Sequence, residues 1–102
     1  MPASELDAAP KPVSRVMPIY PAQALKQRVR GIVVLRVLVD ETGRPADVRV
    51  EQGARDDLNQ AAIEAARQWR FEPGRKDGHA VKAYARVRFP FEGVQFARTP
   101  LP

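Results

Sequence analysis

The chain has 102 residues, of which 44% are hydrophobic and 28% are charged, and its formal net charge at neutral pH is +5. This length supports one domain with one modest core, and the composition is that of a globular protein. There is no apolar run of about 20 residues, and the first residues lack a basic start followed by an apolar stretch. We therefore expect neither a membrane-spanning helix nor a signal peptide in this chain.

Residue types that carry catalysis and metal binding are scarce. The chain has no cysteine and a single histidine, His79, so disulfides and thiolate ligands are excluded. One histidine cannot supply the several converging ligands that a metal site needs. The two serines, Ser4 and Ser14, lie in a proline-bearing leader rather than in a rigid cleft. We predict that the protein is not an enzyme and binds no metal or cofactor.

The chain divides into three parts by composition. Residues 1–16 carry prolines and few large apolar side chains, which predicts a flexible linker. Residues 17–92 are predicted to form the domain, and residues 93–102 a C-terminal tail.

The first half of the domain is predicted to be a helix followed by a hairpin. Tyr20-Pro21 opens a short helix over residues 22–28, because proline suits the first helical turn, and Gly31 ends it. Residues 31–40 are dense in β-branched side chains and predict a strand. A loop over residues 40–44 leads to a return strand over residues 45–51, with Ala46, Val48 and Val50 facing inward.

The second half is predicted to be a helix, a loop and a strand. The helix runs from residue 56 or 57 to about Trp69, with a capping box between Asp57 and Gln60 and Trp69 as a core residue. Residues 71–78 contain Pro-Gly and Asp-Gly and predict a loop. Residues 79–91 predict a long strand, in which Pro90 marks an edge strand or a strand end. The fold class is therefore α+β: an antiparallel three-stranded sheet, with element order α-β-β-α-β, packed on two helices.

The order of these motifs resembles the C-terminal domain of the TonB family. The resemblance covers about residues 17–92, and its most specific part is the run that closes the second helix. The matching motifs are Tyr20-Pro21-Ala22, Gly31-Ile32-Val33-Val34, Val39-Asp40-Glu41-Thr42-Gly43-Arg44, Asp47-Val48-Arg49-Val50, Arg67-Gln68-Trp69-Arg70-Phe71-Glu72-Pro73-Gly74 and Val87-Arg88-Phe89-Pro90-Phe91.

The resemblance implies a periplasmic, energy-transducing domain. The full-length protein would be anchored in the inner membrane by an N-terminal helix absent from this chain. Through that missing part, an ExbB–ExbD-type complex would deliver energy from the proton gradient to outer-membrane TonB-dependent transporters. Those transporters would take up nutrients such as iron-siderophore or haem.

The resemblance also implies two contact sites. The TonB box, a short transporter peptide, would add itself as a strand beside the last strand of the domain. The residues expected there are Val81, Lys82, Ala83, Tyr84, Ala85, Arg86, Val87, Arg88 and Phe89. The transporter plug would meet Met17, Ile19, Tyr20 and Gln23. Some relatives carry polar residues in that segment, so Met17 and Ile19 either pack on the partner or join the core.

Alternatives remain open at this point. Lys82, Arg86 and Arg88 share one face, which either steers an acidic peptide or is simply a solvated face. An alternative function is that of a TonB-like domain in an envelope scaffold or signalling protein without a transporter. A pI near 10.2 and 13 arginines also suit a nucleic-acid-binding module, although only Tyr84 is a good aromatic candidate on a sheet face. Isolated domains of this kind could also form homodimers through open sheet edges.

Overall fold

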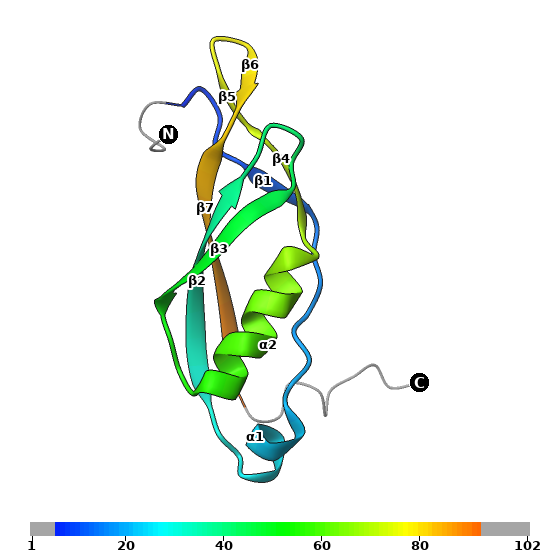
Figure 1. Cartoon of the computed structure of the whole chain (residues 1–102), viewed down its shortest axis with the longest axis vertical. Coiled ribbons are helices and arrows are strands. Elements are labelled where there is room, and N and C mark those ends of the chain that lie inside the picture. Colours follow the sequence, from blue (N-terminus) through cyan, green and yellow to red (C-terminus); the bar gives the residue numbers. More distant parts are fainter. Residues whose placement is uncertain (1–5, 93–102) are drawn as a thin grey trace.

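The computed structural model describes residues 6–92, and its centre is a three-stranded antiparallel sheet of order β3-β2-β7. Strand β2 spans Gly31–Val39, β3 spans Pro45–Gln52 and β7 spans Ala83–Phe91. Helix α2 (Asp56–Arg67) lies along one face of the sheet, and the short helix α1 (Ala22–Lys26) lies at one end of an elongated molecule (Figure 1). The predicted fold class and its three-stranded sheet are confirmed. The predicted tail, residues 93–102, lies outside the described residues.

The core fills the space between α2 and the sheet. Alternate residues of β2 are fully buried, as the dense β-branched pattern indicates: Val33, Leu35, Val37 and Val39. Helix α2 buries Leu58 and three alanines, and these small side chains let the helix approach the sheet closely. Strand β7 contributes Ala83, Val87, Phe89 and Phe91. The predicted inward face of the last strand is thus confirmed for these four residues.

Strand β3 is less buried than its alternating sequence predicts. Ala46 is exposed, and the side chain of Val50 is 40% exposed. The pairing of β3 with β2 shifts register at both ends, between Val34 and Leu35 and between Leu38 and Val39. Among residues 6–92, β3 pairs only with β2 and bulges there, so its inward side chains do not all reach the core.

Two segments predicted to lack regular structure are paired strands. Residues Lys11–Ser14, within the predicted linker, form β1 and pair antiparallel with β4 (Arg70–Glu72). Strands β5 (Gly74–Lys76) and β6 (His79–Val81) form a small hairpin. Its turn is Asp77-Gly78, and both residues have positive φ, as two-residue hairpin turns require. The predictions of a loop over 71–78 and of one unbroken strand over 79–91 are therefore wrong, because the hairpin takes the first residues of that strand.

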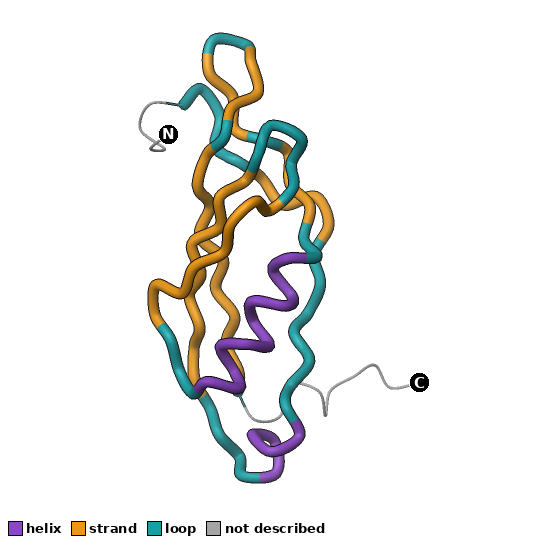
Figure 2. The backbone as a smooth tube through the Cα atoms, in the orientation of Figure 1, coloured by secondary structure: helices purple, strands orange, loops and turns teal. Residues whose placement is uncertain are grey.

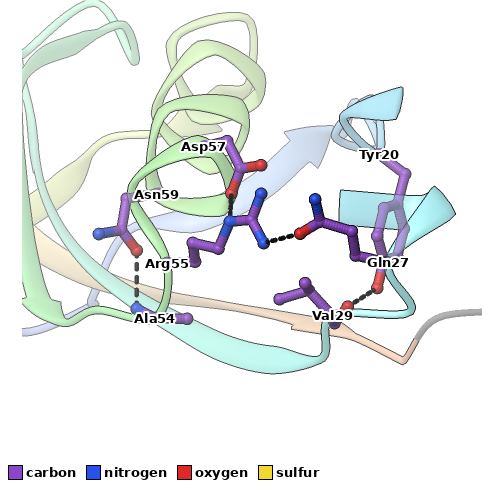
Figure 3. A network of polar contacts seen from close by, with 7 residues as sticks. All are labelled: Tyr20, Gln27, Val29, Ala54, Arg55, Asp57 and Asn59. Atoms are coloured by element: carbon purple, nitrogen blue, oxygen red, sulfur yellow. Dashed lines mark hydrogen bonds and ion pairs between the residues drawn. The ribbon is translucent and has the colours of Figure 1, made fainter. Parts of the chain in front are cut away.

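Both helices are shorter than predicted, and α2 is capped differently. Helix α1 ends at Lys26, since Arg28 adopts φ +55, and α2 ends at Arg67. The first turn of α2 makes no side-chain cap bond, so the predicted capping box is wrong. Instead Nε of Arg55 lies 3.2 Å from Oδ1 of Asp57, which draws that carboxylate away (Figure 3).

The hairpin between β2 and β3 holds the segment after α2. The carboxylate of Asp40 accepts hydrogen bonds from the Thr42 hydroxyl and from the N–H groups of Thr42 and Arg44. The Thr42 hydroxyl bond, followed by the Arg44 amide bond, lowers the pKa of Asp40. Gly43 has φ +89 and accepts a bond from the Phe71 N–H at 2.9 Å, and a Cβ there would lie 2.0 Å from the Phe71 oxygen. Only glycine fits this contact.

Trp69 joins three segments of the chain. Its Nε1–H donates a hydrogen bond to the Val16 carbonyl at 2.9 Å, and its ring meets Phe89 edge-on with the centroids 5.6 Å apart. The indole packs against the core but is only partly buried. Trp69 therefore fixes residues 15–18 to the end of α2 and to β7.

We predict that Trp69→Ala lowers the free energy of unfolding by about 3 kcal/mol, because it removes both the ring contacts and the hydrogen bond. Trp69→Phe keeps an aromatic ring and should cost about 1 kcal/mol. Urea unfolding followed by circular dichroism measures both values. An alanine variant as stable as the phenylalanine variant would contradict this role of the indole ring.

Candidate functional site

Strand β7 is paired on one side only. Its register with β2 runs without a break from Ala83, opposite Val39, to Phe91, opposite Gly31. Among residues 6–92, no strand pairs with its other side. An unpaired strand side offers a row of backbone donors and acceptors to another strand.

Pro90 indicates which backbone groups of β7 face that open side. It lies opposite Ile32 within the paired region, yet proline has no N–H to donate. Proline fits a sheet where its nitrogen points away from the neighbouring strand. Because the direction of backbone groups alternates along a strand, we infer that the N–H groups of Tyr84, Arg86 and Arg88 point to the open side.

The sheet face opposite α2 carries a row of arginines. Arg36 of β2 lies directly between Arg49 of β3 and Arg86 of β7. Like charges placed directly opposite each other repel, and each guanidinium takes a different partner. Arg49 reaches Asp47 at 2.8 Å, Arg86 reaches Glu51 at 2.9 Å, and the Arg36 guanidinium lies 4.7 Å from the centre of the Tyr84 ring. The row is therefore partly neutralised, with Arg86 drawn toward β3.

A groove of about 320 Å³ lies beside the end of β7. On one side it is bounded by residues 15–18 and on the other by residues 88–90, and the Trp69 indole closes it. Its lining residues are Arg15, Val16, Met17, Pro18, Trp69, Arg88, Phe89, Pro90 and Glu92. The groove therefore continues the open side of β7 onto the face of the sheet that carries α2.

The loop that links β1 to α1 runs alongside α2 (Figure 2) and presents two exposed apolar side chains. Met17 is 68% exposed and Ile19 is 83% exposed, whereas Tyr20 is 5% exposed. The Tyr20 hydroxyl donates to the Val29 carbonyl, and its ring meets Phe91 edge-on. Met17 and Ile19 therefore do not join the core.

Polar contacts fix the position of α1 next to α2. Nη1 of Arg55 donates to Oε1 of Gln27 at 2.6 Å, which ties the end of α1 to the start of α2 (Figure 3). The Ala54 N–H donates to Oδ1 of Asn59 at 2.8 Å and holds the turn that precedes α2. Together with Tyr20, these contacts give residues 17–20 a defined place on the surface.

The residues predicted for strand addition do not all lie on one strand. Val81 belongs to β6, where it is opposite Gly74, and Lys82 lies between β6 and β7. The others lie on β7: Tyr84, Arg86 and Arg88 are exposed, Ala85 is half-buried, and Ala83, Val87 and Phe89 are buried. The side chains of the buried three lie in the core, and the same alternation directs their backbone groups toward β2.

The sequence did not point to Arg15, Val16, Pro18 or Trp69 as residues beside a binding surface. Trp69 was predicted as core alone, and it also walls the groove. Val16 and Trp69 are 53 positions apart, and no local pattern signals that they meet.

Two features are absent from residues 6–92. Residues 6–92 contain no group of three or more His, Asp or Glu residues placed to hold a metal ion. Within the same range, no helix is long and apolar enough to cross a membrane.

Comparison with known proteins places this fold in a family. The family described as Gram-negative bacterial TonB protein C-terminal matches residues 16–92. Protein TonB of Xanthomonas campestris pv. campestris (strain B100) is 43% identical over 81 residues, covering 78% of this chain and 34% of that protein. Protein tonB2 of Pseudomonas aeruginosa is 34% identical over 76 residues, covering 74% of this chain and 28% of that protein. The chain thus spans about a third of the length of these relatives.

A solved structure supports the same assignment. The solution NMR structure of the Pseudomonas aeruginosa TonB CTD superposes with a TM-score of 0.67 at 26% identity. The match covers 89% of this chain and 91% of that chain.

We predict that the double substitution Met17→Ser with Ile19→Ser changes the free energy of unfolding by less than about 0.5 kcal/mol, since both side chains are exposed. Tyr20→Phe deletes only the hydroxyl bonded to Val29 and should cost about 1 kcal/mol. Thermal and urea unfolding of the variants test the contrast. A double variant that is less stable than Tyr20→Phe would mean that Met17 and Ile19 support the core.

Proposed function

The chain belongs to the family of C-terminal domains of Gram-negative bacterial TonB proteins, and from this premise we propose that it binds the TonB box of outer-membrane TonB-dependent transporters. The peptide adds itself as a strand along the open side of β7. The single observation that carries the proposal is that β7 is paired with β2 over its whole length and has no strand on its other side among residues 6–92.

Strand addition divides the binding energy between backbone and side chains. Backbone hydrogen bonds to the N–H groups of Tyr84, Arg86 and Arg88 supply affinity, and side chains on the two faces supply selectivity. The arginine side chains of β7 lie on the exposed sheet face and attract an acidic peptide before contact. Affinity is modest, because an unstructured peptide loses conformational entropy when it joins the sheet.

The path of the chain suits the transmission of force. In the full-length protein, an anchor in the inner membrane and an ExbB–ExbD-type complex act through the part that precedes this domain. Tension from that side meets the bridge between Ala8 and Arg75 first, then the β1–β4 pairing, and then the bond from Trp69 to Val16. Trp69 packs on Phe89 of β7, so the loaded segment lies next to the strand that holds the peptide.

The remaining assignments belong to the same proposal. The domain works in the periplasm, and the proton gradient drives the uptake of nutrients such as iron-siderophore or haem through the transporter. The exposed Met17 and Ile19, with Gln23, meet the transporter plug, and the buried Tyr20 holds their segment in place. No nucleic acid takes part.

The alternative is a TonB-like domain of an envelope scaffold or signalling protein, which lacks a transporter partner.

Titration of the ¹⁵N-labelled chain with a synthetic TonB box peptide tests the site. We expect amide shifts along residues 83–90 that exceed those in α2, residues 56–67. Arg86→Pro removes an amide on the open side and should abolish binding, whereas Arg86→Ala keeps that amide and should weaken binding only a few-fold. Circular dichroism must show that the proline variant is folded. Shifts confined to residues 41–44, with 83–90 unmoved, would refute strand addition at β7.

A salt titration tests the electrostatic part. Reversing Arg86 and Arg88 to glutamate should weaken binding and flatten its dependence on salt, while the fold stays intact because both side chains are exposed. Arg49→Glu is the matched control, since Arg49 lies on the same sheet face but on β3. An equal loss of affinity in the control would mean that overall charge, and not the open side of β7, attracts the peptide.

A further inference from the structure

We infer that the peptide beside β7 is selected for a large apolar side chain next to an acidic one: the apolar side chain fills the groove beside Phe89, and the acid meets Arg88. This inference rests on the proposed function and adds the chemistry of the peptide. It follows from the groove, from the partners of the arginines and from the alternation of side chains along a strand.

The groove occupies the place where a side chain of an added strand would lie. Side chains directly opposite each other on adjacent strands share one face of the sheet and have Cβ atoms about 5 Å apart. A residue added opposite Phe89 therefore points to the side of the sheet that carries α2, where the groove lies. Its apolar walls come from segments far apart in the chain: Val16, Met17, Pro18, Trp69, Phe89 and Pro90.

The groove is already built without the peptide. Trp69 is fixed by its bond to the Val16 carbonyl and by edge contact with Phe89. The side chain of Met17 remains 68% exposed beside it. A large aliphatic or aromatic side chain placed here would cover Met17 and the indole ring, whereas alanine would leave most of the volume unfilled.

The neighbouring residues of the peptide point to the opposite face, toward the arginines of β7. Arg86 is engaged by Glu51 at 2.9 Å, and no ion pair among residues 6–92 involves Arg88. Arg88 is exposed and also lines the groove, as Arg15 does. An acid opposite Arg88 therefore gains an ion pair that does not compete with an existing one.

Alternation fixes the spacing of the two side chains. Phe89 and Arg88 are adjacent, so the peptide residues opposite them are adjacent too. The selected pattern is an acid next to a large apolar residue, and the order depends on the direction of the added strand. A peptide with an acid on both sides of the apolar residue satisfies both directions.

The test uses synthetic nonapeptides of the form Thr-Val-Thr-Asp-Leu-Asp-Thr-Val-Thr, titrated into the full 102-residue chain. Three further peptides replace the central triplet with Asp-Ala-Asp, Asn-Leu-Asn or Lys-Leu-Lys. Amide shifts along residues 83–90 report whether each peptide binds at β7. We expect replacement of the peptide leucine by alanine to weaken binding about tenfold. Replacement of the two aspartates by asparagine should weaken it a few-fold at low salt.

Variants of the protein identify the contacts. Met17→Ser should weaken the Asp-Leu-Asp peptide about fivefold and the Asp-Ala-Asp peptide less than about twofold, because only leucine reaches the groove. Val13→Ser is the matched control, since Val13 is 61% exposed on the same leading segment but does not line the groove. Arg88→Glu should reverse the order of affinities, so that the Lys-Leu-Lys peptide binds more tightly than the Asp-Leu-Asp peptide.

The outcomes separate this inference from the proposed function. If all four peptides shift residues 83–90 with equal affinity, strand addition stands and the selection inferred here is wrong. If Met17→Ser and Val13→Ser weaken binding of the Asp-Leu-Asp peptide equally, the apolar side chain does not lie against Met17. If Arg88→Glu leaves the order of the peptide affinities unchanged, the acid does not meet Arg88. If neither these peptides nor a TonB box peptide shifts residues 83–90, the proposed function and this inference both fail.

Discussion

The contact of Trp69 with the Val16 carbonyl and with Phe89 is the one on which the groove beside β7 depends. It connects the leading segment, the end of α2 and the edge strand, which the sequence separates widely. Without it, residues 15–18 would lose their contact with the indole ring that packs on β7, and the groove would lose a wall. The indole serves well because its ring is large and apolar while its N–H donates a hydrogen bond to a backbone carbonyl.

A three-stranded sheet leaves two strands with an open side, and here the two differ in their bulges and in their charges. Strand β3 is bulged at both ends and carries alternating charges, which discourages pairing. Strand β7 pairs with β2 without a register shift and has no acid between Ala83 and Phe91. An edge of this kind is a liability in a structural strand, and it is what a peptide-binding strand requires.

Features that depend on the alternation of neighbouring residues were predicted correctly from the sequence, whereas a pairing between distant segments was missed. The faces of residues 31–39 and 83–91 were predicted correctly, because alternation of side chains is local and the core selects one face. The pairing of Lys11–Ser14 with Arg70–Glu72 was missed, since every residue of β1 is exposed and leaves no apolar pattern. The loop predicted over 71–78 contains the turn signal Asp77-Gly78, but strands of three residues are too short to show a period.

By itself the sequence determined the order of the main elements, the buried faces of the two long strands and the resemblance to a family. These features depend on residues that are neighbours in the chain or lie one period apart. Only the tertiary structure decided that residues 15–18 lie against Trp69, that Arg86 turns toward Glu51 while Arg88 does not, and that a groove continues the open side of β7. Each of these features joins residues from distant segments, and their contacts arise from packing around one shared core rather than from any local preference.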